Sequence, residues 1–199
     1  SYFVPLFLFI TKKLCFDPFS GIVFEIPLFG FNSSSFSHWK RINIKIVKKY
    51  GLGKKLLDFG AGNGYFLFYA RKKGFEIFGV EPNKVAREIA KKNYQVHLWD
   101  PSQLDLSQKV DIITLWHVLE HLPDFKTHMR DFHSILTDKG TLILALPNFE
   151  SYDAYFFKES WAALDTPRHL WHFSAKQIKI LAENFGFFVE NILPMSLDV

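Results

Sequence analysis

The sequence has very little cysteine and no long apolar run. Among its 199 residues, Cys15 is the only cysteine, which excludes an internal disulfide and a zinc site built from several thiols. No apolar stretch reaches the roughly 18–20 residues that a membrane-spanning helix needs. The longest, residues 2–10, contains Pro5 and precedes two lysines, whereas a secretory signal has its cations first. We therefore expect a cytoplasmic protein without a transmembrane segment.

Charge and aromatic residues are unevenly placed along the chain. Residues 1–55 hold nine Lys/Arg against two acids. An anionic partner, such as nucleic acid or a membrane surface, is one interpretation of this basic quarter, and a solvated helix face is another. The chain has 23 Phe residues, and its aromatic residues cluster in residues 2–36 and 149–173, which suggests a cap and a lid. The 48% hydrophobic content excludes general disorder. We predict an irregular aromatic N-terminal extension or cap over 1–36 and one folded domain over 37–199.

From residue 38 onward, helical and extended patterns alternate. Helices are expected at 38–50, 63–73, 83–93, 124–136 and 174–185. Strands are expected at 55–59, 75–80, 95–98, 110–115, 141–146 and 187–193. This alternation is typical of a parallel α/β sheet with right-handed crossovers. Ligands of such sheets bind beyond the carboxyl ends of the strands, so the turns at those ends are the places to look for chemistry.

The first of these turns is rich in glycine. Asp58, Gly60, Gly62 and Gly64 form the pattern Asp-x-Gly-x-Gly-x-Gly directly after the strand predicted at 55–59. Alternate glycines let the backbone turn tightly and approach a ligand closely. A dinucleotide fingerprint would need its third glycine where this chain has Tyr65. An acid ahead of the glycines also suits a cationic group, such as an ammonium, better than a pyrophosphate.

Two more acids follow neighbouring strands. Glu81 ends the second strand, where its carboxylate can accept from both hydroxyls of a ribose; a favourable contact with a helix dipole is the alternative. Asp100 follows the third strand and can accept from an exocyclic amine, with Trp99 or Pro101 against a flat base. A simple Asp-Pro turn is the other interpretation of that site.

Together these motifs resemble class I S-adenosylmethionine-dependent methyltransferases. The resemblance rests on the glycine turn, Glu81, Asp100 and residues 116–121 (WHVLEH), and it covers about residues 50–195. Residues 118–122 (VLEHL) resemble the small-molecule and quinone-modifying branch, and residues 165–174 a poorly characterised subgroup. The resemblance implies a Rossmann-like, doubly wound, mostly parallel α/β sheet. Because only six residues follow the last predicted strand, we expect the final antiparallel strand of that sheet to be missing.

The resemblance also implies a cofactor and a role for each motif. S-adenosylmethionine would bind with its ammonium and carboxylate at Asp58 and the glycine turn, its ribose at Glu81 and its adenine at Asp100. Residues 115–117 would line the sulfonium, and 149–172 would cover the acceptor. The expected cofactor-binding residues are Asp58, Gly60, Ala61, Gly62, Gly64, Glu81, Pro82, Trp99, Asp100, Leu115, Trp116 and His117. The product would be S-adenosylhomocysteine.

The aromatic stretch offers residues for the acceptor side. A neutral His169 can act as a general base near pH 7, or it can be a lid residue bonded to a carbonyl. Arg168 can bind a substrate carboxylate or pair with Asp165. We expect His169 and His117 to be catalytic, and the expected substrate-binding residues are Tyr155, Trp161, Arg168 and His172. Tyr155 and Trp161 can alternatively form the core of the lid.

The predicted reaction is methyl transfer to a small, partly apolar or aromatic acceptor. The attacking atom stays open among oxygen, nitrogen and carbon, and no nucleic-acid partner is expected. Two other hypotheses are a non-catalytic methyltransferase-like binding module and an NAD-type oxidoreductase. Residues 117–121 (HVLEH) also match the zinc-peptidase motif H-x-x-E-H, which needs both histidines on one helix face and a third ligand. Because the motif directly follows a buried strand, we expect no metal there, and His121 as a helix-start or supporting residue.

Overall fold

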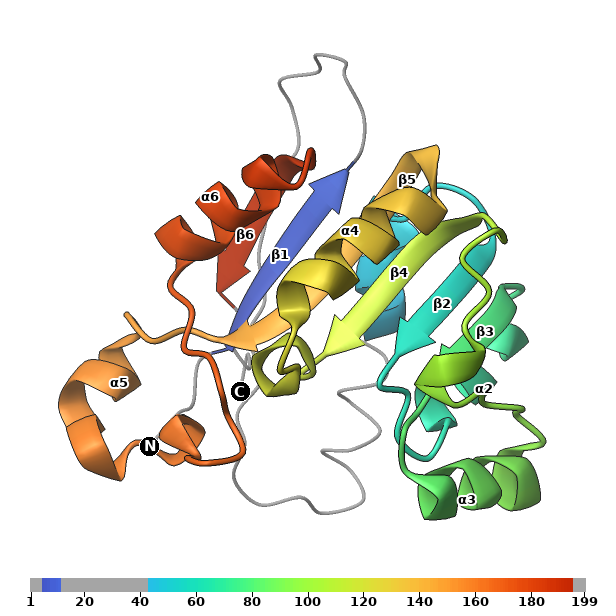
Figure 1. Cartoon of the computed structure of the whole chain (residues 1–199), viewed down its shortest axis with the longest axis horizontal. Helices are drawn as coiled ribbons and strands as arrows, with labels where there is room; N and C mark the ends of the chain where they lie inside the picture. The colour runs from blue at the N-terminus through green and yellow to red at the C-terminus, as the bar shows by residue number, and fades with distance from the viewer. Residues whose placement is uncertain (1–4, 12–42, 195–199) are drawn as a thin grey trace.

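A single mixed sheet forms the centre of the described structure, a computed structural model that covers residues 5–11 and 43–194 (Figure 1). Its strands are β1 (Pro5–Thr11), β2 (Lys55–Phe59), β3 (Glu76–Val80), β4 (Val110–Trp116), β5 (Leu136–Pro147) and β6 (Phe188–Pro194). They lie in the order β3-β2-β4-β5-β1-β6. β2 pairs in parallel with β3 and β4, and β4 pairs in parallel with β5. The predicted Rossmann-like, mostly parallel α/β class is confirmed.

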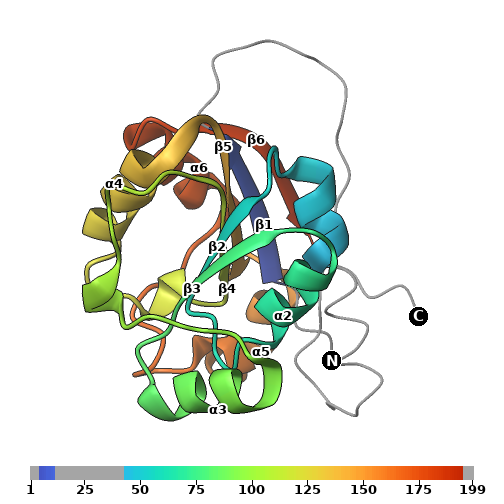
Figure 2. The same cartoon turned by 90° about the vertical axis from the view of Figure 1, so that its right-hand side faces the viewer.

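Helices cover both faces of this sheet (Figure 2). They are α2 (Tyr65–Lys72), α3 (Lys84–Tyr94), α4 (Phe125–Ile135), α5 (Tyr152–Phe157) and α6 (Ala175–Asn184), and residues 43–50 are also helical. α4 and α6 pack around one apolar core with Leu57, while residues 43–50, α2 and α3 pack around a second core with Leu56. Successive residues of β2 are therefore buried on opposite faces, as expected for a strand inside a parallel sheet.

Residues 5–11 correct the prediction of an irregular extension. They form β1, which is antiparallel to both β5 and β6, with Leu8 opposite Leu144 and Ile192. An antiparallel strand is thus present where we expected the sheet to lack one, and it comes from the start of the chain. Without it, the facing N–H and C=O groups of β5 and β6 would lack their ladder partners. The rest of the expected cap, residues 1–4 and 12–36, lies outside the described residues.

The strand expected at 95–98 is reduced to one bridge, between Val80 and Trp99. The reason lies in the end of α3. Gln95 takes a left-handed conformation there, and the N–H groups of Gln95 and Val96 bond to carbonyls of the last helical turn. Those donors are therefore not available to a sheet ladder, and pairing with β3 begins only at Trp99.

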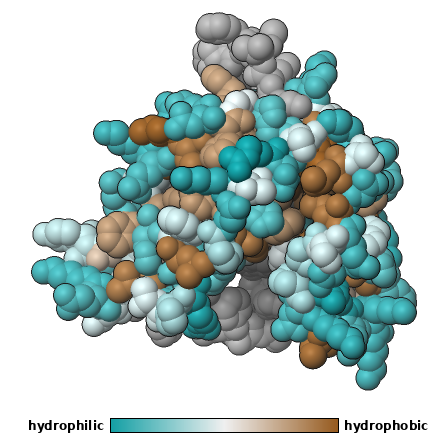
Figure 3. Space-filling model, in the orientation of Figure 1, coloured by the Kyte–Doolittle hydropathy of each residue, from teal (hydrophilic) through white to brown (hydrophobic). Residues whose placement is uncertain are grey.

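The carboxyl ends of β2, β3 and β4 meet at one edge of the sheet, the lower edge in Figure 1. There Asp58 lies opposite Gly79 of β3 and Thr114 of β4. In the space-filling view the surface is hollowed beyond the ends of β2 and β4 (Figure 3). The turns that follow these strands therefore surround a common space. Within the described ranges, no helix combines the length and apolarity needed to cross a bilayer.

Candidate functional site

Asp58 is a buried carboxylate at the end of β2. Its side chain is only 2% exposed, and the Thr114 hydroxyl donates a hydrogen bond of 2.6 Å to its Oδ1. Burial raises the pKa of Asp58 to about 7, the Thr114 hydrogen bond opposes this shift, and the negative charge of Glu81 adds to it. Thr114 and Glu81 are the groups that act on it in the described part of the chain, and a buried acid with a pKa near neutrality is suited to receive a positively charged ligand group.

The glycine turn takes the backbone conformation that its sequence predicts. Gly60, Gly62 and Gly64 all have positive φ values, of 79°, 54° and 73°. A side chain at Gly60 would collide with Val118, at 2.5 Å, whereas a Cβ at Gly62 would meet no atom within 4 Å. Gly60 is thus required by packing against the turn after β4. Gly62 borders open space, as expected for a position where a ligand approaches the backbone.

Glu81 follows β3 and holds the glycine turn in place. Its side chain accepts hydrogen bonds from the N–H of Gly62 at 2.7 Å and from the N–H of Asn83 at 2.9 Å. The N–H groups of Gly60 and Ala61 both bond to the Val80 carbonyl. Most donors of the turn are therefore satisfied within the protein, and a carboxylate stands where a phosphate-binding loop would receive a phosphate oxygen.

Asp100 is tied to its own turn and to α3. Oδ1 accepts from the N–H and hydroxyl of Ser102, while Oδ2 accepts from Arg87 Nη1 at 3.1 Å. The Ser102 hydrogen bonds, and then Arg87, lower the pKa of Asp100. Arg87 also donates to the carbonyls of Glu81 and Pro82, so one side chain joins the turns after β3 and after residue 99. Pro82 itself is exposed beside this junction.

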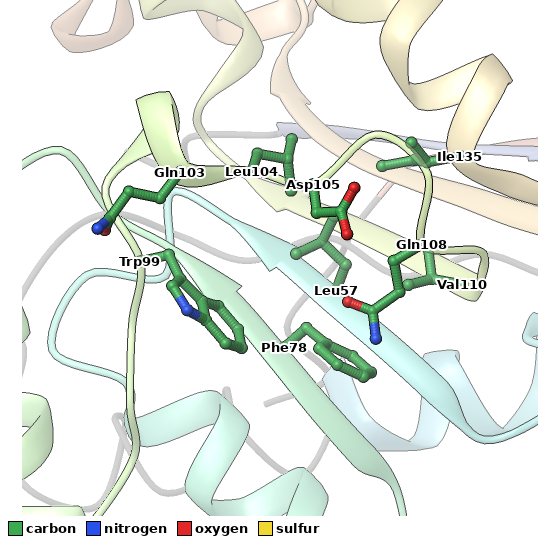
Figure 4. Close-up of a pocket in the computed structure, with 9 residues that line it drawn as sticks. All are labelled: Leu57, Phe78, Trp99, Gln103, Leu104, Asp105, Gln108, Val110 and Ile135. Carbon is green, nitrogen blue, oxygen red and sulfur yellow. The ribbon is translucent and has the colours of Figure 1, made fainter.

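The Trp99 side chain lies on the sheet face. Its ring stacks on Phe78 at a centroid distance of 6.1 Å and borders a cavity of about 170 Å³ (Figure 4). The cavity is lined by Leu57, Phe78, Trp99, Gln103, Leu104, Asp105, Gln108, Val110 and Ile135. None of these residues belongs to the glycine turn, but Trp99 and Gln103 belong to the turn that carries Asp100, where the Asp100 N–H donates to Gln103 Oε1.

The turn after β4 contributes residues 115–121. Leu115 is fully buried in the core, so its side chain is not free to contact a ligand at the edge. Trp116 packs edge-to-face against Phe66. His117 has a left-handed backbone, with φ of 57°, and its Nδ1 lies 3.5 Å from Oε1 of the buried Glu120. Glu120 and His121 then form the short 3₁₀ turn η2 (Leu119–His121).

The lid predicted from the aromatic stretch is folded as α5 followed by the short 3₁₀ turns η3 (Lys158–Ser160) and η4 (Ala162–Leu164). Trp161 is 4% exposed and packs with Ala163 in a small core of its own. Tyr155 is 77% exposed on α5. Of the two aromatic residues expected at the acceptor, Trp161 therefore supports the lid, and Tyr155 lies on the surface.

Residues 165–172 connect the lid to the turn after β4. His169 Nδ1 bonds to the Ala163 carbonyl at 2.7 Å, and burial lowers the pKa of His169. His172 bonds to the Leu164 carbonyl at 2.9 Å. Arg168 donates to Asp165 at 3.0 and 2.6 Å, which is the structural pair that the sequence left open as an alternative. The structure thus places His169 beside His121, with ring centroids 4.6 Å apart.

Comparison with known proteins identifies the family of this chain. The sequence matches the family described as "Methyltransferase domain" over residues 35–192. The chain belongs to this family. The predicted resemblance to class I S-adenosylmethionine-dependent methyltransferases is thereby confirmed. A solved magnesium protoporphyrin IX methyltransferase from Synechocystis, with bound SAH, has the same fold, with a TM-score of 0.58 at 15% identity over 78% of each chain.

Curated relatives of the methyltransferase domain act on different molecules. A ubiquinone biosynthesis O-methyltransferase from Haemophilus ducreyi is 30% identical over 54% of this chain and 52% of its own length. A 23S rRNA (uracil(747)-C(5))-methyltransferase from Pyrococcus abyssi is 37% identical over 43% of this chain and 21% of its own length. The chain thus spans about half of one relative and a fifth of the other.

Three polar residues of this methyltransferase domain were missed by the sequence reasoning. Thr114 lies in a continuous apolar run, and its hydrogen bond to Asp58 follows only from the strand register. Arg87 lies on a helix rich in charge, where nothing marks it as a link between two turns. Glu120 was visible inside the motif at 117–121, but its complete burial could not be read from its neighbours.

Proposed function

We propose that this methyltransferase domain binds S-adenosylmethionine and transfers its methyl group to a small, partly apolar or aromatic acceptor. The observation that carries the proposal is the pair of buried carboxylates, Asp58 and Glu81, on either side of a left-handed glycine turn. The cofactor carries an ammonium and a sulfonium, which favour negative partners, and a ribose diol, which suits a carboxylate acceptor.

The same geometry is unfavourable for a dinucleotide. Gly62 already donates its N–H to Glu81, and Asp58 lies close enough for the charge of Glu81 to affect its pKa. A diphosphate brought to this turn would face two carboxylates and would displace one of them from its backbone donor. This argument supports the methyltransferase over the alternative NAD-type oxidoreductase.

The roles of individual residues follow from their positions. Asp58 would bind the ammonium, with Gly60, Ala61, Gly62 and Gly64 forming the wall behind it. Glu81 and Pro82 would bind the ribose side, and Asp100 the adenine amine. The edge at 115–117 would lie beside the sulfonium. Trp99 stacks on Phe78, and we propose that it supports the turn that carries Asp100.

The chemical step needs orientation more than a special catalytic group. A lone pair of the acceptor forms a bond to the methyl carbon while the methyl–sulfur bond breaks, and its electron pair stays on sulfur as a neutral thioether. A proton carried by the acceptor atom is released. Positioning of two reactants in line can supply about 7–11 kcal/mol of the barrier. We propose two histidines at the acceptor: His169, from the lid segment after η4, and His117, from the turn after β4.

The acceptor class is argued from the lid. Tyr152, Tyr155 and Phe156 are each more than 60% exposed on α5, and an aromatic surface on the lid suits an apolar small molecule. An RNA acceptor, as in the Pyrococcus relative, would instead call for a basic surface. The body of the chain, residues 56–199, holds fifteen Lys/Arg against eighteen acids. The single cysteine is in keeping with a cytoplasmic setting.

Calorimetry with S-adenosylhomocysteine and NADH tests the cofactor. Asp58→Ala and Glu81→Ala should each weaken S-adenosylhomocysteine binding by at least tenfold, because each removes a hydrogen bond to a charged group worth about 1.5–3 kcal/mol. Glu76→Ala, an exposed carboxylate at the start of β3, should leave binding unchanged. Binding of NADH but not S-adenosylhomocysteine would refute the proposal. Product formation with small-molecule against RNA fractions of a cell extract then assigns the acceptor class.

A further inference from the structure

Three side chains on the acceptor side form a cluster that the cofactor site does not use. Glu120, His121 and His169 each offer a ligand atom, and these atoms all lie within 4.8 Å of one another. We propose that this cluster binds one divalent transition-metal ion, with Zn²⁺ as the best match. Metal binding at this cluster does not depend on the proposed methyl transfer. Only the role of the metal at the acceptor rests on that proposed function.

Glu120 provides the first argument. Its side chain is fully buried, and neither of its oxygens has a hydrogen-bond partner among the described residues. Three histidines that can carry a positive charge surround it: His121, His169 and His117, whose Nδ1 lies 3.5 Å from Oε1. An ionised carboxylate buried without hydrogen bonds is costly unless it is paired or coordinates a metal. A cation held between Glu120 and the two histidines would remove that cost.

The tautomers of the two histidines provide the second argument. His121 Nδ1 lies 2.9 Å from the Arg168 carbonyl, and His169 Nδ1 lies 2.7 Å from the Ala163 carbonyl. A carbonyl can only accept, so in each ring Nδ1 carries a hydrogen, and in the neutral ring Nε2 then keeps its lone pair. Histidines that bind metals typically donate their other N–H to a carbonyl or carboxylate in this way. Asp165 Oδ2, at 3.8 Å from His169 Nε2, is too far for a hydrogen bond.

The backbone holds the three ligands together. The N–H of Leu170 donates to the Glu120 carbonyl at 2.8 Å, and Trp171 Nε1 donates to the Leu122 carbonyl at 2.9 Å. The lid segment is therefore fastened to the turn after β4, although the two are about 50 residues apart in sequence. Ligands supplied by two segments that are already joined need little rearrangement to bind an ion.

The ligand set indicates which metal and which role. Two imidazoles and one carboxylate occur in catalytic zinc sites that leave a fourth position open, whereas Mg²⁺ and Ca²⁺ prefer oxygen ligands. The prediction of no metal assumed that both histidines of the 117–121 motif would be needed. The structure instead combines Glu120 and His121 from that motif with His169 from the lid. At the open position the metal would hold an acceptor oxygen and lower its pKa.

Direct metal binding tests the proposal. The untagged full chain is treated with EDTA, desalted and titrated with Co²⁺, whose visible absorption reports inner-sphere ligands, followed by displacement with Zn²⁺. We expect one equivalent to bind. Glu120→Gln and His169→Gln should weaken binding by at least tenfold, while His97→Gln, an exposed histidine outside the cluster, should not. Absence of one-to-one binding, or equal binding by all variants, would overturn the proposal.

Thermal unfolding with and without Zn²⁺ shows whether a variant that binds metal weakly is still folded. Glu120→Gln replaces a buried carboxyl group that has no hydrogen-bond partner among the described residues with a neutral amide, and it should fold at least as stably as the metal-free wild type. Zn²⁺ should raise the Tm of the wild type and of His97→Gln but not that of Glu120→Gln, and His121→Gln provides a further variant of the same cluster. S-adenosylhomocysteine binding is measured on the same samples. A wild-type protein that binds S-adenosylhomocysteine but no metal contradicts the metal site alone. A wild-type protein that binds the metal but not S-adenosylhomocysteine contradicts the proposed function alone.

Discussion

At the scale of single residues, Asp58 has the most unusual environment at the candidate cofactor site. A carboxyl group with a pKa of about 7 is half protonated at neutral pH, and only its ionised form attracts an ammonium. The hydroxyl of Thr114 limits the shift by donating to the carboxylate. The strength of cofactor binding should therefore depend on pH in a range where most carboxylates are already ionised.

The affinity for S-adenosylhomocysteine should fall as the pH is lowered through 7. At pH 6 only about a tenth of Asp58 is ionised in the free protein, so the apparent affinity should drop about tenfold per pH unit below 7 and level off above pH 8. Calorimetry between pH 5.5 and 8.5 measures this profile. Thr114→Val, which removes the opposing hydrogen bond, should move the midpoint to higher pH. A flat profile would contradict the role of Asp58.

Asp58→Asn should stabilise the fold while it weakens cofactor binding. The folded pKa of Asp58 is raised above the unfolded value of 3.8, so its contribution to stability is fully present below pH 4 and is lost as the pH rises to about 7. The neutral amide of the Asp58→Asn variant does not ionise, so the variant does not lose this stability as the pH rises. Relative to the wild type, the variant should gain up to about 4 kcal/mol of unfolding free energy at pH 8 and much less at pH 4.5. Urea unfolding at the two pH values measures the difference, and equal gains at both would contradict the argument.

At the scale of elements, the glycine turn combines two different demands on its glycines. Gly60 lacks a side chain because Val118 occupies the space, and Gly62 lacks one although the space beside it is empty. The first is a packing requirement between the turns after β2 and β4. The second leaves room for a ligand. Substitution at each position should therefore affect stability and binding in different proportions.

Gly62→Ala should reduce cofactor affinity with only a small loss of stability. The left-handed backbone costs about 1–2 kcal/mol for an L-residue, and the new methyl group enters the open space. Gly74→Ala is the matched control, because Gly74 also has a positive φ and open space but lies after α2, away from the site. We expect similar Tm losses for both variants and loss of S-adenosylhomocysteine binding only for Gly62→Ala. Gly60→Ala should lose more stability than either. Equal affinities for the two variants would contradict this assignment.

Local patterns predicted most of the elements of the domain. The strand at 55–59 has the predicted bounds, and the helix predicted at 174–185 begins at a capping box formed by Ser174 and Gln177. Signals of this kind lie within a few residues of the element that they define. The prediction of a strand at 95–98 was wrong because the cap of α3 uses the first N–H groups of that segment. The strand at 5–11 was missed because its partners in β5 lie at least 130 residues away in sequence.

The site was predictable where a single turn carries it. Asp58, the glycines and Glu81 are brought together by adjacent parallel strands, which the βα alternation already implies. The cluster of Glu120, His121 and His169 was not predictable. His169 lies near Glu120 because hydrogen bonds such as that from the Leu170 N–H to the Glu120 carbonyl hold the two segments together. No periodicity encodes such a contact between two irregular segments.

At the scale of the whole molecule, the sheet consists of a parallel part that carries the site and an antiparallel part completed by β1. β2, β3 and β4 position the polar edge, while β6 joins the sheet through β1 in the described structure. Stability of the β6 side and binding at the β2–β4 edge should therefore be separable. A substitution in β1 can therefore separate the stability of the β6 side from binding at the β2–β4 edge.

Leu8→Pro should loosen β6 without abolishing cofactor binding. In a strand paired on both sides, each N–H faces one neighbour or the other, so a proline removes a ladder donor and leaves a carbonyl unsatisfied at a cost of about 1–3 kcal/mol. Leu8→Ala, which keeps the N–H, separates this effect from loss of the side chain. Hydrogen exchange should show faster exchange in β6 (Phe188–Pro194) than in β2 (Lys55–Phe59) for the proline variant only, and S-adenosylhomocysteine affinity should change less than threefold. Unchanged protection of β6 would mean that β1 does not hold it in the sheet, and parallel loss of protection in β2 would mean that the two parts unfold as one unit.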